Sequence, residues 1–252
     1  MNRSIMEKDK MRLDQLLVSQ GLVRSRAHAK DLIVKGHIIC DQEVANKANK
    51  IVSKRSTLKV VGLSSDWVSR GGFKLFGALE HFKIELANKI CLDIGASTGG
   101  FTHVLLCGGV QKVYAVDVGS FQLSDTVKSD PRVINLENTD ARKLNNEIIV
   151  DPLDLVVCDV SFISLKKVLV PSMALIKTGG QLLCLFKPQF EIGPGKLKKT
   201  GVLNDASMRV QLLKEMEHWF LSMEGWKLQG STESVLTGRN GNKEFFLLVE
   251  KL

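Results

Sequence analysis

The sequence predicts an α/β fold with an open, mostly parallel sheet and a small basic module ahead of it. Three observations support this prediction. From residue 90 onward, short apolar runs of strand length alternate with helical patterns. Several of these runs end at a charged residue, as expected for a site at the carboxyl ends of parallel strands. Residues 1–70 contain 14 basic and 7 acidic residues, whereas residues 71–252 contain 21 and 20.

Length and charge limit the class of protein. The 252 residues are 44% hydrophobic and carry a net charge of +8. This is enough chain for one α/β domain of common size and a small module. The basic excess of the module predicts a polyanionic partner, with a basic surface that binds nothing as the alternative.

The cysteines and the first residues indicate a compartment. None of the five cysteines forms a C-x-x-C pair, so we expect reduced thiols and no metal site. Cys91, Cys158 and Cys184 lie within apolar runs and are expected to be buried. The segment Met1–Arg12 is polar and charged, and no apolar run approaches the ~20 residues of a membrane span. We therefore expect a cytoplasmic protein.

The basic module is predicted to contain two helices and short strands. After a frayed start over residues 1–10, apolar residues at helical spacing predict a helix over 13–21, ended by a glycine. A second helix is expected over 25–36, with Ser25 as its N-cap and a glycine at its end. Strands are expected at 38–40 and 57–61.

This module resembles an S4-type RNA-binding domain over about residues 11–61. The residues that carry the resemblance are Arg12-Leu13-Asp14-Gln15-Leu16-Leu17, Ser25-Arg26-Ala27 and Leu32-Ile33-Val34-Lys35-Gly36-His37-Ile38. The resemblance implies binding to structured RNA, with basic residues of the helices on phosphates; a solvated basic face is the alternative. The residues predicted to contact RNA are Arg12, Arg24, Arg26, Lys30 and Lys35. Lys198 and Lys199 of a later glycine-rich loop are predicted to contact RNA as well, with a solvated loop that binds nothing as the alternative.

Domain boundaries follow from composition. We predict an RNA-binding domain over 1–61, ordered from about residue 11, a linker over 62–70, and the α/β domain over 71–252. Trp67 in the linker is expected to pack at the domain junction, with base stacking as the alternative. A helix is then expected from Gly71.

A glycine-rich turn organises the α/β domain. A strand over 90–94 ends in this turn, and Asp117 lies at the tip of the next strand, where an acid commonly holds ribose hydroxyls of a nucleotide-like cofactor. The turn is not G-x-G-x-x-G, and Asp93 before it suits a cationic amino-acid group, which favours S-adenosylmethionine over NAD. The predicted cofactor residues are Asp93, Gly95, Ala96, Ser97, Gly99, Gly100, Phe101, Asp117, Asp140 and Asp159.

The remaining elements continue the alternation and bring charges to strand ends. Strands are expected at 131–136, 153–158, 181–186, 226–228 and 244–249, and a long helix at 206–221. Three charged residues lie at or just past the ends of such segments, Asp159, Lys187 and Glu244, and Lys74 starts a helix ahead of the glycine-rich turn. This set suits methylation of a ribose hydroxyl, because a neutral lysine can accept the hydroxyl proton while carboxylates hold the amines in place. Positioning would supply much of the rate.

The whole chain resembles the TlyA (haemolysin A-like) family. The matching motifs are Ser69-Arg70-Gly71-Gly72-Phe73-Lys74-Leu75, Asp93-Ile94-Gly95-Ala96-Ser97-Thr98-Gly99-Gly100-Phe101-Thr102, Asp159-Val160-Ser161-Phe162-Ile163-Ser164-Leu165, Lys187-Pro188-Gln189-Phe190-Glu191 and Gly241-Asn242-Lys243-Glu244-Phe245. The resemblance implies an S4 domain joined to a Rossmann-like, FtsJ-like S-adenosylmethionine methyltransferase sheet. It also implies a catalytic tetrad of Lys74, Asp159, Lys187 and Glu244, and cytidine 2′-O-methylation in ribosomal RNA, free or in ribosomal subunits. Asp66 departs from a basic junction pattern of some members.

Other functions are weighed against this one. Base-amine methylation would need D/N-P-P-Y/F after the fourth strand, where the chain has Asp159-Val160-Ser161-Phe162. Methylation of a pyrimidine carbon would need a cysteine nucleophile, but Cys158 is expected to point into the core. A membrane-active haemolysin and an RNA-binding regulator without catalysis are the alternatives. The sequence leaves the modified nucleotide, the ribosomal subunit and the oligomeric state open.

Overall fold

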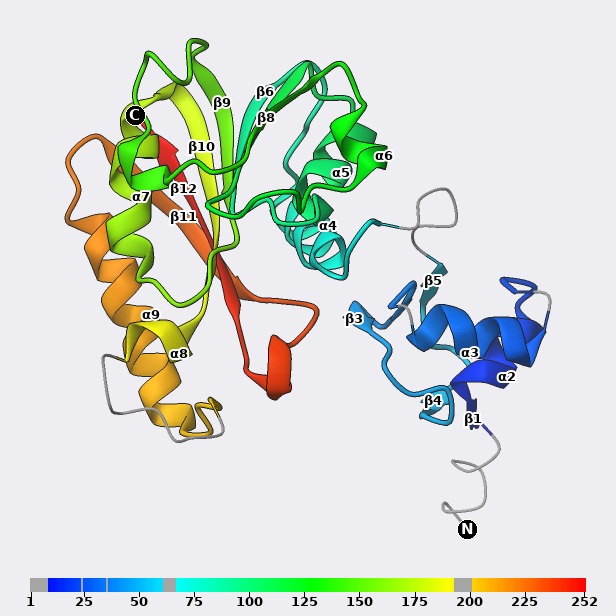
Figure 1. Cartoon of the computed structure of the whole chain (residues 1–252). Coiled ribbons are helices and arrows are strands. Elements are labelled where there is room, and N and C mark those ends of the chain that lie inside the picture. The colour runs from blue at the N-terminus through cyan, green and yellow to red at the C-terminus, as the bar shows by residue number, and fades with distance from the viewer. Residues whose placement is uncertain (1–8, 24, 35, 61–66, 193–200) are drawn as a thin grey trace. The chain divides into compact units, whose positions relative to one another are not determined.

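The computed structural model describes residues 9–23, 25–34, 36–60, 67–192 and 201–252 (Figure 1). These residues form two compact units, an N-terminal unit over 1–73 and a C-terminal unit over 74–252. Each unit has a hydrophobic core of its own. In the described part of the chain, no helix has the length and apolar character needed to cross a membrane.

The N-terminal unit combines two helices with two small antiparallel sheets. Its elements are β1 (Lys10–Arg12), α2 (Leu13–Ser19), α3 (Arg26–Val34), β2 (Ile38–Cys40), β3 (Glu43–Val44), β4 (Ile51–Ser53) and β5 (Leu58–Val60). Strand β1 pairs with β4, and β2 lies between β3 and β5. The core contains Leu13 and Leu17 of α2, Ile33 of α3 and Ile38 of β2, all fully buried.

The ends of both helices follow from local chemistry, as predicted. Gly21 adopts a φ of +69° two residues after the end of α2, and Gly36 a φ of +80° two residues after the end of α3, conformations that glycine reaches without strain. The hydroxyl of Ser25 accepts a hydrogen bond from the backbone N–H of His28 at 3.2 Å, which caps α3. The pairing of β1 with β4 was not predicted, because three-residue strands give no measurable alternation.

The C-terminal unit is an α/β sheet. Its elements are α4 (Gly71–Phe82), β6 (Ile90–Ile94), α5 (Gly100–Cys107), β7 (Lys112–Val116), α6 (Asp125–Lys128), β8 (Val133–Leu136), η1 (Ala141–Lys143), β9 (Leu153–Cys158), α7 (Leu165–Ala174), β10 (Ile176–Phe186), α8 (Pro188–Glu191), α9 (Ala206–Leu221), β11 (Trp226–Glu233), η2 (Arg239–Gly241) and β12 (Phe245–Lys251), with α4 starting three residues before the unit boundary. This agrees with the predicted alternation of strands and helices.

The seven strands lie in the order β11-β12-β10-β9-β6-β7-β8. Strands β6 to β10 are parallel, and β12 is antiparallel to both of its neighbours. Figure 1 shows α4 and α5 on one side of the sheet and α7 and α9 on the other. Strand β10 begins at Ile176, five residues earlier than predicted. Ile176 already pairs with β9, and an irregularity between Ile176 and Gln181 separates it from the continuous ladder that the apolar pattern marked.

The central strands are apolar on both faces because helices cover both. In β6, Leu92 and Ile94 belong to the core cluster that includes α7 and α9, whereas Cys91 and Asp93 alternate to the opposite face. On that opposite face the rings of Phe101 and Phe246 stack at 6.2 Å. The fold thereby places the carboxyl ends of five parallel strands at one edge.

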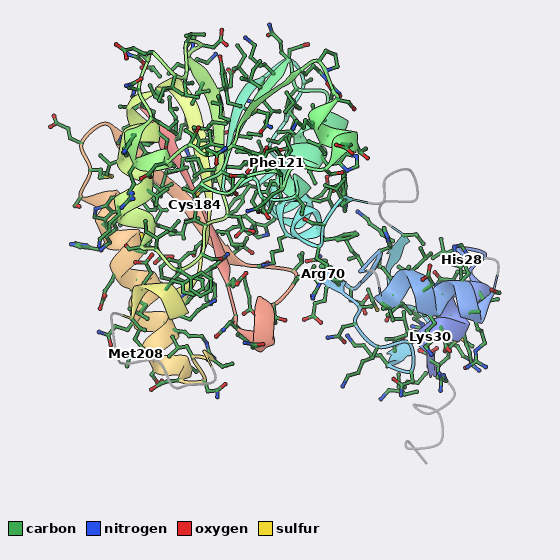
Figure 2. The ribbon with its side chains drawn as sticks, in the orientation of Figure 1. His28, Lys30, Arg70, Phe121, Cys184 and Met208 are labelled. Atoms are coloured by element: carbon green, nitrogen blue, oxygen red, sulfur yellow. The ribbon has the colours of Figure 1, made fainter. Side chains whose placement is uncertain are left out.

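Four of the five cysteines are buried, and Cys107, at the end of α5, is exposed. Cys184 lies in the middle of the sheet (Figure 2). Burial raises the pKa of both Cys91 and Cys184 to about 12, because a thiolate is poorly solvated there. Cys158 is fully buried as well, as predicted.

The core of α9 can be tested with two adjacent residues. Phe220 is fully buried in the core cluster, whereas the next residue, Leu221, is 63% exposed. We expect Phe220→Ala to lower the free energy of unfolding by about 3–5 kcal/mol, and Leu221→Ala by less than about 0.5 kcal/mol. Urea unfolding followed by circular dichroism measures both. Equal losses in the two variants would contradict this packing of α9.

Candidate active site

The candidate site lies where neighbouring strands end. Phe186 and Phe245 form the last register pair of β10 and β12. Lys187 follows the first and Glu244 precedes the second, so these two residues occupy the next position on adjacent strands. Asp159 follows β9, which is the other neighbour of β10. Residues far apart in sequence are thereby brought to one edge by the pairing of the strands.

Lys187 is held by two acceptors. Its Nζ lies 2.5 Å from Oδ1 of Asp159 and donates a hydrogen bond to Oγ of Ser161 at 2.9 Å. The Lys187 side chain is 9% exposed and the Asp159 side chain 21%. A cation this deeply buried requires a partner, and the carboxylate supplies it. The pair leaves one edge of the amine for a third group.

A second lysine–carboxylate pair joins α4 to β12. Nζ of Lys74 lies 2.6 Å from Oε2 of Glu244, with the two side chains 12% and 3% exposed. Gly238 provides the room for this carboxylate, because a Cβ at that position would overlap Oε1 of Glu244. The four predicted catalytic residues therefore form two buried ion pairs.

The glycine-rich turn lies against the backbone of Asp159. Gly95 has a φ of +82°, and a Cβ built on it would overlap the carbonyl oxygen of Asp159. The N–H of Asp159 also donates to the carbonyl of Ile94 at 2.9 Å. The turn requires glycine here for two reasons, its backbone conformation and its close contact with β9. This contact links the predicted cofactor loop to the Lys187–Asp159 pair.

Asp117, at the tip of β7, organises the other side of the turn. Its Oδ2 accepts from the N–H of Ser97 at 2.8 Å and its Oδ1 from the N–H of Gly119 at 2.7 Å. Each carboxylate oxygen can accept a further hydrogen bond. The half-buried Asp117 therefore retains acceptor capacity for two hydroxyl groups, which fits the ribose of a nucleotide-like cofactor.

Asp93 is completely buried beneath the turn. Oγ1 of Thr102 donates to its Oδ2 at 2.7 Å, and within the described residues its Oδ1 has no hydrogen-bond partner. Burial raises the pKa of Asp93 to about 7. The carboxyl group supports the start of α5 in this structure; the predicted contact with a cationic ligand group stays a prediction.

The other predicted cofactor residues occupy different environments. Ala96 and Gly100 line the turn and are buried, whereas Ser97 is exposed. The ring of Phe101 belongs to the core, where it stacks on Phe246. Asp140 caps η1 and pairs with Arg142, whose guanidinium lies 2.6 Å from Oδ2 of Asp140, so a contact of this carboxylate with adenine stays a prediction.

The predicted RNA-binding residues fall partly outside the described residues, namely Arg24, Lys35, Lys198 and Lys199, as does Asp66. Lys30 is exposed on α3 (Figure 2). Arg12 and Arg26 both bind the carboxylate of Asp14, an arrangement the sequence did not indicate. Trp67 contacts Phe73, with ring centroids 6.4 Å apart.

Sequence reasoning missed two residues beside the Lys187–Asp159 pair. Ser161 binds Lys187, and Phe162 is 89% exposed with its ring centroid 4.8 Å from that of Phe190. Phe162 has a φ of +64°, which is uncommon for a side chain of this size. A phenylalanine three residues after a charged strand end was the signal that could have marked it. Phe121, 94% exposed after β7, is a second such residue (Figure 2).

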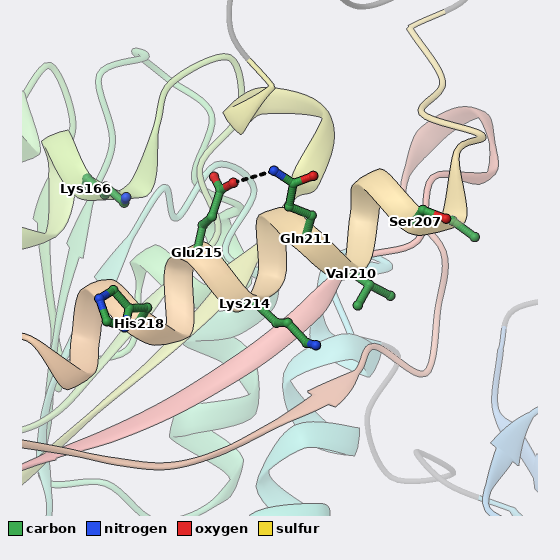
Figure 3. Close-up of a pocket in the computed structure, with 8 residues that line it drawn as sticks. Lys166, Ser207, Val210, Gln211, Lys214, Glu215 and His218 are labelled. Carbon is green, nitrogen blue, oxygen red and sulfur yellow. Dashed lines mark hydrogen bonds between the residues drawn. The ribbon is translucent and has the colours of Figure 1, made fainter.

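Two grooves of the C-terminal unit differ in their relation to this site. One, of about 740 Å³, is lined by Phe162, Gln189 and Phe190 among other residues, and so runs beside Lys187. The other, of about 940 Å³, lies along α9 (Figure 3), where Nε2 of Gln211 donates to Oε1 of Glu215. Among the described residues, neither groove is lined by a predicted site residue, but Nζ of Lys187 lies 5.9 Å from the ring centroid of Phe190 in the smaller groove. We therefore assign the chemistry to the strand ends beside the smaller groove.

Comparison with known families gives the class of protein. Residues 67–251 match the family model of the FtsJ-like methyltransferases, and residues 11–57 match that of the S4 domain. The chain is therefore an FtsJ-like methyltransferase preceded by an S4 domain, in agreement with the strand-end site and the basic N-terminal unit.

Individual relatives narrow the class. A Mycobacterium tuberculosis protein named 16S/23S rRNA (cytidine-2′-O)-methyltransferase TlyA is 44% identical over 94% of this chain and 88% of its own. Hemolysin A of Brachyspira hyodysenteriae is 38% identical over 93% and 98%. A solved structure from Streptococcus thermophilus, 34% identical, covers 96% of this chain and 89% of its own with a TM-score of 0.71. The chain belongs to the TlyA (haemolysin A-like) family, as its motifs indicated.

The contact of Gly95 with Asp159 can be tested against a matched glycine. Gly109 has a similar φ of +79°, but nothing lies within 4 Å of a Cβ built there. We expect Gly109→Ala to cost about 1 kcal/mol through its backbone conformation alone. Gly95→Ala should cost about 2 kcal/mol more, because the new methyl overlaps a backbone carbonyl. Urea unfolding of both variants measures the difference. Equal losses of stability would show that the turn is not in close contact with the backbone of Asp159.

The buried carboxyl of Asp93 predicts a pH dependence. Its pKa is raised in the folded state, so the folded chain holds a proton that the unfolded chain releases between about pH 4 and pH 7. Stability from this group therefore falls as pH rises through that window. Between pH 4 and pH 8, Asp93→Asn should gain stability relative to the unmodified protein by up to about 4 kcal/mol.

The control for this prediction is a carboxylate with the opposite behaviour. Hydrogen bonds from Arg132 lower the pKa of Asp130, so Asp130 stabilises the folded state above the unfolded pKa and loses that effect as pH falls. Asp130→Asn should therefore lose stability relative to the unmodified protein as pH rises. Thermal unfolding across the pH range measures both, and a pH-independent difference for Asp93→Asn would contradict its assignment.

Proposed function

We propose that this chain transfers a methyl group from S-adenosylmethionine to the ribose 2′-hydroxyl of a cytidine in ribosomal RNA. The observation that carries the proposal is the pair of buried lysine–carboxylate contacts, Lys187–Asp159 and Lys74–Glu244, at adjacent strand ends next to the glycine-rich turn. Cytidine and ribosomal RNA as the target are taken from the name of the Mycobacterium tuberculosis relative.

Lys187 is the residue we assign to the hydroxyl proton. In this role the Lys187 ammonium would first release one proton to water. The neutral amine then has two N–H groups and one lone pair, with Asp159 at 2.5 Å and Ser161 at 2.9 Å as its two neighbours. With both N–H groups held, the lone pair is directed away from them, toward a substrate hydroxyl at the third position. The hydroxyl would give its proton to Nζ as its oxygen bonds to the methyl carbon and the carbon–sulfur bond breaks, with its electron pair leaving on the sulfur of a thioether. The ammonium would afterwards release that proton to water.

Lys74 and Glu244 supply a second, oriented amine. Its charge is matched by a carboxylate that is almost fully buried, so the lysine head has little freedom to move. We assign Lys74 to a hydrogen bond with the ribose oxygens, which fixes the sugar relative to Lys187. Glu244 acts through Lys74 and is a positioning residue.

The turn and its neighbours fit the cofactor. When bound, S-adenosylmethionine supplies a methyl group activated by a sulfonium. Asp117 would accept hydrogen bonds from the ribose hydroxyls with the lone pairs left by Ser97 and Gly119. Gly95 and Gly99, with φ values of +82° and +92°, give the turn the shape against which the ligand would lie. The predicted roles of Asp93 and Asp140 belong to the same proposal.

The RNA is assigned to the S4 unit and to the groove beside Lys187. The S4 unit presents Arg12, Arg26 and Lys30 to solvent, and basic side chains of this kind contact phosphates. The exposed ring of Phe162 offers a base a stacking surface next to the reacting amine. With an RNA substrate and reduced thiols, we place the reaction in the cytoplasm.

Lys187→Ala tests the mechanism. We expect it to lower methylation of ribosomal RNA by about 100-fold or more, because the proton acceptor is removed. Binding of S-adenosylmethionine, measured by calorimetry, should change by less than about threefold. Methyl transfer is measured with radiolabelled donor, and the modified nucleotide is identified by digestion and mass spectrometry.

Lys177→Ala is the matched control. Lys177 lies on the same strand as the residues leading to Lys187 and pairs with Asp154 at 2.6 Å, but at the opposite end of β10, and it is half-exposed. The Lys177→Ala variant removes the same positive charge as Lys187→Ala and should leave methylation unchanged. Unaltered turnover in Lys187→Ala would remove the mechanism, and a product other than 2′-O-methylcytidine would correct the substrate.

A further inference from the structure

The S4 unit contains a buried carboxylate shared by two arginines. Oδ1 of Asp14 accepts from Nε of Arg12 at 2.9 Å, and Oδ2 accepts from Nη2 of Arg12 at 3.0 Å. Oδ2 also accepts from Nε and Nη2 of Arg26, at 3.2 and 2.9 Å. The Asp14 side chain is 6% exposed, whereas those of Arg12 and Arg26 are 39% and 55% exposed.

The hydrogen-bond capacity of these groups shows what remains for a ligand. A carboxylate has about four acceptor positions, and the two arginines direct four N–H groups at Asp14, one to Oδ1 and three to Oδ2. Each guanidinium has five N–H donors, of which Asp14 engages two, on the Nε/Nη2 edge. The edge formed by Nη1 and the second hydrogen of Nη2 has the spacing that grips a phosphate through two parallel hydrogen bonds.

The backbones that carry these side chains are fixed independently. Arg12 is paired with Ile51 in the β1–β4 ladder, and the N–H of Asp14 donates to the carbonyl of Ala48 at 3.0 Å. Arg26 is the first residue of α3, which the hydroxyl of Ser25 caps. Because the three backbones are held, the contacts with Asp14 set the direction of each guanidinium rather than the path of the chain.

We propose that Asp14 is a positioning residue that holds Arg12 and Arg26 as one binding site for a backbone phosphate of the RNA. The inference rests on the RNA substrate of the proposed function and adds the site on the S4 unit that receives it. The carboxylate fixes both guanidinium groups before the RNA arrives, so less side-chain freedom is lost on binding.

The charge of the site makes the inference testable. Hydrogen bonds from Arg12 and then Arg26 lower the pKa of Asp14 to about 2, so the carboxylate is ionised at any pH used for RNA binding. Counting charges alone, removal of this negative group from an RNA-binding face should strengthen binding. Positioning predicts the opposite sign, because the two guanidinium groups lose their shared anchor.

The experiment measures binding of the full chain to transcripts of 16S and 23S ribosomal RNA, without methyl donor, across about 50–200 mM KCl. We expect Asp14→Asn to bind the preferred transcript about tenfold more weakly and to reduce the salt dependence by about one phosphate contact. The control is Glu43→Gln in β3, whose side chain is 79% exposed and lies 3.7 Å from Lys50. This charge removal should leave affinity equal or slightly higher.

A second measurement separates positioning from a general effect on the fold. In an Arg12→Gln, Arg26→Gln background, Asp14→Asn should have no further effect on RNA affinity, because its two partners are gone. If Asp14→Asn does not fold, the two arginine variants still test the shared site. Each alone should cost about tenfold, and together less than the product of the two.

Four results would overturn the inference: equal or tighter binding by Asp14→Asn, an undiminished effect in the background that lacks both arginines, additive losses for the two arginines, or no binding of either transcript by the unmodified protein. These outcomes are independent of methyl transfer. Methylation that depends on Lys187 together with tight binding by Asp14→Asn would reject the positioning role and keep the enzyme. If Asp14→Asn binds RNA weakly but the unmodified protein transfers no methyl group, the positioning role of Asp14 is kept and the proposed enzyme is rejected.

Discussion

The parallel pairing of β9 with β10 is the constraint on which the rest of the site depends. Cys158 and Cys184 form the last matched pair of these strands, and the residues that follow include Asp159 and Lys187. A slip of this register by one residue would turn the alternating side chains of a strand to the other face. The strands are buried on both faces, so such a slip would move each side chain into a space packed around a residue of different size and shape. The core therefore fixes the distance between the amine and its carboxylate.

Burial makes the two members of each ion pair dependent on one another. Taking a lysine or a glutamate out of water is costly, and the cost is offset only when the partner is present with good geometry. Glu244 is almost fully buried, so loss of Lys74 would leave a carboxylate without a counter-charge. Substitution of one member thus alters the other, and effects measured at single positions belong to the pair. Gly238 takes part indirectly, since only a glycine leaves space for the carboxylate.

The sequence predicted the sheet, the three charged strand ends and the lysine at the start of α4 because all of them depend on short-range patterns. The apolar run that ends at Cys158 marks its strand, and Asp159 stands out at its end. Ser161 could not be found in this way, because its partner Lys187 lies 26 residues away in sequence. The same holds for Asp14, where one carboxylate meets an arginine two residues before it and another twelve residues after it. The contact of Asp140 with Arg142, two residues later, was not predicted either, and the ligand role assigned to Asp140 stays a prediction.

The contact between Lys74 and Glu244 spans 170 positions in the chain. During vectorial synthesis the lysine leaves the ribosome long before its carboxylate is made, and β12 must still enter the sheet between β10 and β11. Until then the nascent chain has an amine without its counter-charge and a sheet with an open edge beside β10. The chain thus brings its four candidate site residues together only after nearly all of its own translation is over.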